Sequence, residues 1–588
     1  MTENDIVALW PGRLALHHRI RLFVVSLALL LASLHLQAAW AQTTSPCDNA
    51  GPFGVPGLQL PPDEIGEWGP VEQWPIQAQH SNLLPTGKVL FWREGPLRTV
   101  AVWVWDPIAN TFGERPSPSN VMCAGHAALA DGRTIVIGGT FEGIASGLPD
   151  TNIFDPYSES WVRVADMAVG RWYPTATALP DGRILAVSGH IKHGPLETAT
   201  IPEVYDVDTD TWVQLNGAEL LLPTYPFNFV LPNGKIFTVG PSNITQALDV
   251  DTQTWEVVGS TNPSFAGSAV MYRPGKVMKI GIQGQDRIDM TVESPTWGTL
   301  APMEFPRREP DLVLLPDGTV LAVGGSVAGV SAPECAIHAA EFWDPDTEVW
   351  TTLASMERPR IYHSTALLLP DGRVLAAGGE NSVTGGEENA EIYSPPYLFK
   401  GPRPSVDSAP TEVSYGSKFR VDTQDPRSIV SVSFIRPGAV THSFDGNQRF
   451  VPLDFRATGT HLRVTAPANA NVAPPGQYML FLVSSGGVPS EARFVGLDSA
   501  CTATEEPEFS CADGVDNDCD GLVDGNDPDC GSPPVCDGDG ICEVSEDCQD
   551  CSTDCDGRQT GKPAKRFCCG DGIPQSTEGD GTICDGNF

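Results

Sequence analysis

The sequence predicts an all-β protein: a seven-bladed β-propeller, then an immunoglobulin-like β-sandwich, then a small disulfide-rich tail. A tight-turn motif recurs seven times between residues 80 and 380, strand-like stretches without that period follow it, and 12 of the 15 cysteines lie beyond residue 500. The 588 residues include 59 glycines and 52 prolines, which favours short strands joined by turns over long helices. A chain of this length exceeds one ordinary core, so several domains are expected.

The N-terminus has the pattern of an export signal. Arginines at 13, 19 and 21 precede an apolar run at 22–34, and Ala39-Trp40-Ala41 then offers small residues at the spacing of a cleavage site. We therefore expect residues 1–41 to be a signal peptide and 42–74 a lead-in segment. The alternative is a membrane anchor, but the run has 13 residues where a span needs about 20. No transmembrane span is expected, and the mature protein should be secreted or held at the cell surface.

The seven repeats define the propeller at residues 75–400. Each contains a short turn, such as Pro180-Asp181-Gly182, between two apolar runs, and glycine accepts the positive φ that such a hairpin needs. The turn glycines lie 41 to 54 residues apart. They are Gly87, Gly132, Gly182, Gly234, Gly275, Gly318 and Gly372.

A second element identifies the repeat type. An aspartate is followed six residues later by an aromatic residue, as in Asp155/Trp161 and Asp344/Trp350. Hairpin units of this period with a closing tryptophan are typical of kelch propellers, whose blades must close into a ring because no blade buries both faces alone. The period stops after residue 397, and residues 404–498 alternate strand-like stretches with Pro/Gly turns, which predicts the β-sandwich.

The repeat register points to a metal site. Counting nine residues back from the turn glycine gives Cys123, Tyr173 and His363, and Tyr362 stands one residue further back. Equivalent slots in different blades face the same end of the ring, so these groups should converge. Imidazole and oxygen ligands suit Cu(II), although this pattern lacks a second nitrogen ligand. Alternatively they are ordinary strand-face aromatics, since Tyr225 fills the same slot with no histidine beside it.

Several segments together carry a family resemblance. They read Cys-Ala-Gly at 123–125, Arg-Trp-Tyr-Pro at 171–174, Tyr-His-Ser-Thr at 362–365 and Ile-Arg-Pro-Gly-Ala-Val-Thr-His at 435–442, with Gly-Gln-Tyr-Met-Leu-Phe at 476–481. At these residues the chain resembles the galactose oxidase and glyoxal oxidase family of copper radical oxidases, over about residues 75–498. The resemblance implies a kelch propeller followed by an early-set domain.

The resemblance also implies a site and a reaction. Cys123 and Tyr173 would be joined by a thioether, and Tyr173, Tyr362, His363 and His442 would ligate copper. The cross-linked tyrosyl radical would remove a hydrogen atom from the substrate carbon, with Tyr362 as general base. The implied substrates are a primary alcohol, a hydrated aldehyde or a carbohydrate, with dioxygen reduced to hydrogen peroxide.

Two residues concern the substrate. Arg307 stands at the family's substrate-binding arginine; it could instead be a rim arginine in an ion pair, and Arg308 is a second candidate. Galactose oxidase stacks a tryptophan over the cross-link a little after the tyrosine, where this chain has Ser188-Gly189-His190. His190 either takes that place or is a plain loop residue. This departure, and the lack of a galactose-binding domain before the propeller, favour glyoxal-type aldehydes or other primary alcohols.

The cysteine count agrees with a special role for Cys123. The twelve tail cysteines can pair among themselves, and Cys47 could pair with Cys335. Cys123 is then left over, and an odd cysteine in an exported protein indicates special chemistry.

The tail at 501–588 carries 22 acidic and 4 basic residues, close to half of the chain's net charge of −38. Its aspartates have the spacing of a calcium loop, without flanking helices; a solvated acidic linker is the alternative. The candidate calcium ligands are Asp516, Asp518, Asp520, Asp524 and Asp527. We expect the tail to be a disulfide module for attachment to the cell surface or matrix.

The charge and the motifs weigh against other functions. Nucleic-acid binding is not expected, because the chain lacks clustered Lys and Arg. A sialidase-like hydrolase needs a carboxylate pair and an arginine cluster, which the motifs do not supply. The remaining alternative is a catalytically silent propeller that binds carbohydrate or protein outside the cell; such a module has no need of all five residues of the copper site.

Overall fold

The computed structural model describes Cys47 and residues 60–498, apart from 95–99, 142–145, 194–195, 262–266, 330 and 384. The predicted signal peptide and the acidic tail, with all five aspartates of the predicted calcium loop, lie outside the described residues. Among those that are described, no helix is long and apolar enough to cross a bilayer. The elements below all belong to one compact unit that starts at Phe53.

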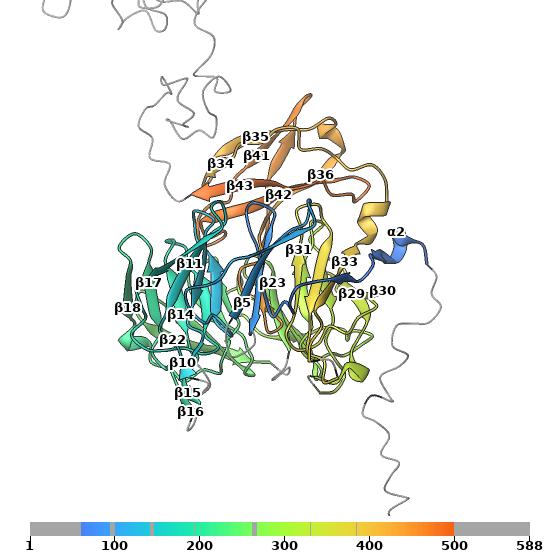
Figure 1. Cartoon of the computed structure of the whole chain (residues 1–588). Helices are drawn as coiled ribbons and strands as arrows, with labels where there is room; N and C mark the ends of the chain where they lie inside the picture. Colours follow the sequence, from blue (N-terminus) through green and yellow to red (C-terminus); the bar gives the residue numbers. More distant parts are fainter. Residues whose placement is uncertain are drawn as a thin grey trace, which may run out of the picture. The chain divides into compact units, whose positions relative to one another are not determined.

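The described repeats fold into consecutive antiparallel sheets, each started by its innermost strand (Figure 1). The first holds β3 (His80–Leu83), β4 (Val89–Glu94), β5 (Val100–Asp106) and β6 (Thr111–Glu114). The second holds β7 (Gly125–Ala128), β8 (Thr134–Ile137), β11 (Thr151–Asp155) and β12 (Ser160–Val164). The third holds β13 (Thr175–Ala178), β14 (Ile184–Val187), β17 (Glu203–Asp206) and β18 (Thr211–Gln214). The fourth holds β19 (Asn228–Val230), β20 (Ile236–Thr238), β21 (Ile244–Asp249) and β22 (Thr254–Ser260).

Three more sheets follow the same plan. The fifth holds β23 (Ser268–Arg273), β24 (Lys276–Gly281), β25 (Gly284–Asp289) and β26 (Gly298–Thr299). The sixth holds β27 (Asp311–Leu314), β28 (Val320–Val323), β29 (Ala339–Asp344) and β30 (Val349–Ser355). The last holds β31 (Ser364–Leu368), β32 (Val374–Gly378) and β33 (Asn389–Ser394), and the N-terminal strands β1 (Glu67–Trp68) and β2 (Glu72–Gln73) pair with β33. The first described strands thus complete the last sheet.

Short elements lie outside these sheets. They are α2 (Pro62–Ile65), the pairs β9 (Thr140–Phe141) with β10 (Ser146–Gly147) and β15 (His190–His193) with β16 (Leu196–Thr198), and the 3-10 turns η2 (Asn216–Ala218), η3 (Pro333–Cys335), η4 (Pro396–Phe399) and η5 (Pro426–Ser428).

The burial of each strand explains its sequence. The second strand of a sheet is an unbroken apolar run because both of its faces are covered, as in β14 (Ile-Leu-Ala-Val) and β28 (Val-Leu-Ala-Val), which are buried throughout. The outer strands β12 and β18 alternate between half-buried and exposed residues. The closing tryptophans link neighbouring sheets: the Trp161 indole donates to the Arg115 carbonyl and that of Trp255 to the Ala218 carbonyl, both at 2.9 Å.

The β-sandwich has a five-stranded and a three-stranded sheet around its own apolar core. The larger sheet runs β34 (Glu412–Ser414), β43 (Arg493–Asp498), β42 (Gly476–Ser484), β36 (Ile429–Arg436) and β39 (Arg449–Pro452). The smaller runs β35 (Lys418–Asp422), β41 (His461–Thr465) and β40 (Phe455–Ala457). Its strands are orange in Figure 1.

One hairpin of the sandwich enters the propeller. β37 (Ala439–Thr441) pairs with β3, the innermost strand of the first sheet, and β38 (Phe444–Asp445) returns beside it. The next residues fasten the hairpin to other sheets: Gln448 bonds both the amide of Leu314 and the carbonyl of Leu312, and Arg449 donates to the carbonyl of Val230. The hairpin therefore extends a propeller sheet inward, toward the axis.

The predicted all-β class, with a propeller followed by a sandwich, is confirmed. The number of blades stays a prediction; the seven sheets among the described residues agree with it. Cys47 and Cys335 are both disulfide-bonded, as predicted, and Cys123 is the free cysteine in the described part of the chain.

Candidate metal centre

Four site residues share one backbone position. Cys123, Tyr173, Tyr225 and His363 each stand one to three residues before an innermost strand, with φ of 54°, 67°, 48° and 65°. The Tyr173 amide donates to the Cys123 carbonyl, and the Tyr225 amide to the Tyr173 carbonyl, both at 2.9 Å. Left-handed backbone is costly for bulky residues and clusters at functional sites. Here it directs side chains from several sheets toward one point.

The sandwich hairpin supplies His442. His442 and Ser443 form its tip with φ of 48° and 64°, the pair of positive values that a two-residue I′ turn needs. The Asp445 carboxylate accepts hydrogen bonds from the amides of Ala439, Asn447 and Gln448, which fixes the turn. Pairing of Thr441 with His80 in β3 then places His442 among the propeller side chains.

The predicted copper-site residues lie together. The Nε2 atoms of His363 and His442 are 3.0 Å apart, and the hydroxyls of Tyr173 and Tyr362 are 3.4 Å apart. Ligand atoms of Cys123, His363 and His442 all lie within 4.8 Å of one another. The His442 ring stands edge-on to that of Tyr173, with centroids 5.0 Å apart. Five residues from three sheets and the hairpin thus form one cluster.

Hydrogen bonds fix the tautomer of both histidines. His363 Nδ1 lies 2.8 Å from the Glu380 carboxylate, an acceptor, so Nδ1 carries the proton. His442 Nδ1 lies 2.7 Å from the Thr441 hydroxyl, which itself donates to the Gln79 carbonyl. Thr441 therefore accepts from His442. Both Nε2 lone pairs face the cluster, as histidine ligands of a metal require.

Burial keeps the isolated cluster neutral. It raises the pKa of the Tyr173 and Tyr362 phenols, with Cys123 adding to the effect on both, and raises that of the Cys123 thiol to about 12. Burial, then His363 and His126, lowers the pKa of His442 well below its ordinary value. Phenolates here need a cation beside them, and two neutral imidazoles offer it lone pairs. This N,O donor set fits Cu(II).

Cys123 is in contact with two aromatic side chains. Its thiol interacts with the side chains of Tyr173 and Trp172. The rings of Trp172 and Tyr173 lie 4.5 Å apart at 53°. An aromatic side chain therefore packs against the Tyr173 ring, but it is that of Trp172, the residue just before Tyr173, and not a side chain from the 188–190 segment. His190 lies beyond it, 6.0 Å from the Trp172 ring and paired with the Trp172 backbone.

A buried histidine chain holds the Cys123 backbone. The Cys123 amide donates to His80 Nε2 at 3.2 Å, so His80 Nδ1 is protonated and donates to His126, which donates to Asn82 at 2.8 Å. Burial lowers the pKa of His126 to about 3 and that of His80 well below its ordinary value. Both are neutral, which this chain of donors and acceptors requires.

The structure corrects the expectation for Arg307. Its side chain is fully buried and donates to the carbonyls of Phe305, Gly324 and Ala339 and to the Glu341 carboxylate. Arg171 with Glu203 and Arg360 with Glu391 form the same buried pair in their own sheets. Arg307 is thus a recurring structural arginine of the repeat, with no donor left for a substrate. The other candidate, Arg308, is only half-buried.

Some residues near the cluster were not expected from the sequence. Glu309 could have been identified from the sequence, because it lies nine residues before the turn glycine Gly318, as Cys123 lies nine residues before Gly132. Trp172 adjoins Tyr173 and could have been considered. Glu380 and His80 have no local signal, since only folding brings them to the site.

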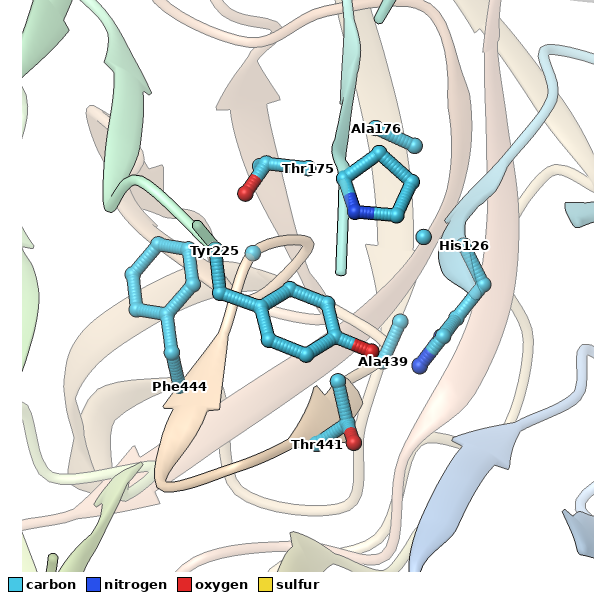
Figure 2. A pocket seen from close by; sticks show the side chains of 10 residues that line it. His126, Thr175, Ala176, Tyr225, Ala439, Thr441 and Phe444 are labelled. Carbon is cyan, nitrogen blue, oxygen red and sulfur yellow. The ribbon is translucent and has the colours of Figure 1, made fainter. Parts of the chain in front are cut away.

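A small pocket lies behind Tyr225 (Figure 2). Residues of β7, β13, β37 and β38 line it, and the Tyr225 ring stands beside Phe444 with its hydroxyl toward the side of His126 and Ala439. That hydroxyl donates to the Ala124 carbonyl at 3.0 Å. Tyr225 is therefore held by the propeller, and its ring packs 4.6 Å from His442.

Two family models match the chain. The "Glyoxal oxidase N-terminus" model matches residues 266–393, and the "Galactose oxidase-like, Early set domain" model matches residues 403–497. The two matches cover the end of the propeller and the sandwich.

Individual relatives extend the match. The galactose oxidase of Gibberella zeae is 27% identical over 75% of this chain and 72% of its own length. The aldehyde oxidase GLOX of Vitis pseudoreticulata is 30% identical over 66% of this chain and 84% of its own length. A solved fungal alcohol oxidase of the AA5 family, in complex with copper, aligns with a TM-score of 0.67 at 26% identity, over 74% of this chain and all of its own. The chain belongs to the galactose oxidase and glyoxal oxidase family.

Proposed function

We propose that this protein is a copper-dependent oxidase that converts a primary alcohol or a hydrated aldehyde to its oxidised product and reduces dioxygen to hydrogen peroxide. The observation that carries the proposal is the convergence of Cys123, Tyr173, Tyr362, His363 and His442 on one point. The two histidine Nε2 atoms, 3.0 Å apart, and the two phenol hydroxyls, 3.4 Å apart, form a set of two nitrogen and two oxygen donors. The relatives named above are oxidases of alcohols and aldehydes.

Tyr173, Tyr362, His363 and His442 would hold the copper. When bound, copper supplies one-electron redox chemistry and a positive charge that lowers the pKa of the phenols. Glu380 and Thr441 keep the histidine protons on Nδ1. The chain's part is therefore to present two oxygen and two nitrogen donors in fixed protonation states.

The side chains divide the work of the reaction. Tyr362 takes the hydroxyl proton of the substrate as general base; as a buried phenolate it is a strong one. The Tyr173 radical takes the hydrogen atom from the substrate carbon. One hydroxyl proton, one carbon-bound hydrogen atom and one further electron leave the substrate, which amounts to two protons and two electrons in total, and dioxygen receives them as hydrogen peroxide.

A thioether between Cys123 and Tyr173 is part of the proposal. The thiol interacts with the side chains of Tyr173 and Trp172, and burial keeps it protonated in isolation. Formation of the bond removes the thiol hydrogen and one ring hydrogen as two reducing equivalents, which dioxygen accepts. Trp172 then covers the modified ring and shields its radical from solvent.

Copper loading of the full chain tests both parts. We expect peroxide release with an alcohol or aldehyde, and a mass lower by two hydrogen atoms with loss of the free thiol at Cys123. Cys123→Ser is the matched control that binds copper without the mass change. A copper-loaded protein that keeps its thiol and releases no peroxide from any alcohol or aldehyde would exclude the oxidase and favour a binding module.

We also propose that the protein is exported and that its tail binds calcium. Residues 1–41 have the pattern of a signal peptide. The tail would then anchor or space the enzyme at the cell surface or matrix. N-terminal sequencing of secreted protein should begin near Gln42, and Asp518→Asn should weaken calcium binding by the full chain. A retained N-terminus, or calcium binding unchanged in that variant, contradicts these two points.

A further inference from the structure

Glu309 occupies the ring position of the site residues. It stands nine residues before Gly318, as Cys123, Tyr173 and His363 stand before their own turn glycines. Its φ of 49° is left-handed like theirs, and it precedes the innermost strand β27. Since equivalent positions in a ring of sheets face the same end, the Glu309 carboxyl belongs to the end at which the cluster lies.

One oxygen of the Glu309 carboxyl is buried without a hydrogen-bond partner. Its Oε2 atom is out of contact with solvent and has no hydrogen-bond donor among the described residues. The carboxyl interacts electrostatically with Tyr362 and with its neighbour Arg308. A buried polar atom without a partner is costly, and such groups in native structures commonly serve a ligand. Burial also raises the pKa of Glu309 to about 7, with Arg308 opposing the rise.

A structural role does not account for this glutamate. The structural carboxylates of the repeat, Glu203, Glu341 and Glu391, are fully buried and each pairs with a buried arginine. Each also accepts a backbone amide, as Glu341 does from Glu304 at 2.8 Å. Glu309 has neither partner. Arg307, two residues earlier, already fills the arginine position of its sheet.

We propose that Glu309 is a substrate-binding carboxyl, which accepts a hydrogen bond from the second hydroxyl of a hydrated aldehyde while Tyr362 takes the proton of the first. The inference rests on the proposed function and assigns its substrate class as geminal diols. The reaction converts the diol and dioxygen to a carboxylic acid and hydrogen peroxide: the C–H bond and one O–H bond break, and a C=O bond forms. A simple alcohol has no second hydroxyl and gains nothing from Glu309.

The test compares two substrates in copper-loaded full-length protein. For Glu309→Leu, which removes the hydrogen-bond acceptor, we expect kcat/KM for glyoxal, a hydrated aldehyde, to fall about 10- to 100-fold, the usual range for losing a hydrogen bond to a carboxylate. For benzyl alcohol we expect no change. Glu334→Gln, at an exposed glutamate of the same repeat, should change neither value. An equal loss for both substrates, or no loss for glyoxal, overturns the inference.

A binding experiment separates this inference from the proposed function. Hexafluoroacetone hydrate is a geminal diol without the carbon-bound hydrogen that oxidation removes, and hexafluoroisopropanol is its single-hydroxyl counterpart. By calorimetry, wild type should bind the diol about 10- to 100-fold more tightly than Glu309→Leu does, and both proteins should bind the alcohol equally. If diol binding depends on Glu309 but the protein oxidises no substrate, the proposed function is wrong and the Glu309 inference stands. If the protein oxidises its substrates but the variant binds the diol as tightly as wild type, the Glu309 inference is wrong and the proposed function stands.

Discussion

Glu380→Ala should weaken copper binding although Glu380 is not itself a copper ligand, because it contacts the ligand His363. The Glu380 carboxylate lies 2.8 Å from His363 Nδ1 and keeps the proton there. Gln79 also reaches this nitrogen, with its Nε2 donor at 3.3 Å. Without Glu380, the donor that remains at Nδ1 favours the other tautomer, in which the proton sits on Nε2 and blocks the ligand atom.

The magnitude follows from the contact. A hydrogen bond to a charged group contributes about 1.5–3 kcal/mol, which corresponds to roughly 10- to 150-fold in a binding constant. Loss of a partner that orients a metal ligand typically costs 10- to 100-fold in affinity. We therefore expect Glu380→Ala to raise the Kd for Cu(II) by about 10- to 100-fold, and Glu380→Gln, whose amide oxygen still accepts, by less.

The assay is a competition titration of Cu(II) between the apo full chain and a chelator. The variants are made on the Cys123→Ser background, so that cross-link formation does not make binding irreversible. Glu388→Gln is the control, because Glu388 is an exposed glutamate of the same segment that pairs with Arg93. Adding Gln79→Leu should restore part of the affinity lost in Glu380→Ala. An unchanged Kd in Glu380→Ala, or no recovery in the double variant, would refute the tautomer argument.

Four further outcomes are expected. Tyr362→Phe should lower kcat by about 10²- to 10⁴-fold in a peroxide assay, the usual contribution of a general base, and an unchanged kcat contradicts that role. Arg307→Ala leaves Glu341 buried and unpaired, so urea unfolding should show a loss of about 3–5 kcal/mol; a raised KM without lost stability would return Arg307 to the substrate. The folded pKa of Glu309, about 7, lies above the ordinary 4.5, so its neutral form is favoured in the fold; wild type should lose stability relative to Glu309→Gln as pH rises from about 4.5 to about 7, and a parallel pair of Tm curves argues against this. Trp172→Ala uncovers the Tyr173 ring, so the radical absorbance of the oxidised protein should decay faster than in wild type, and equal decay rates would show that Trp172 does not shield it.

The repeat register made much of the site predictable. Turn glycines can be recognised in the sequence because few other residues adopt their positive φ. Counting nine residues back from each of them gives the residue that lies just before the innermost strand of a sheet. The same count identified Cys123 and Tyr173, and it also contains Glu309. It could not show that Arg307 is a structural arginine, because the count does not reveal its partner Glu341, which only folding brings to it.

The sequence by itself determined the periodic part of this protein: the all-β class, the repeat, the sandwich and the residue types of a copper site. Local rules suffice there, since turn chemistry and strand burial depend on neighbours in the chain. Only the tertiary structure decided which side chains act on one another. His442 reaches the cluster because β37 pairs with β3, some 360 residues earlier in the chain. Glu380 fixes a tautomer, and Trp172 rather than His190 packs against the tyrosine ring, because such contacts depend on packing between sheets, which no local spacing records.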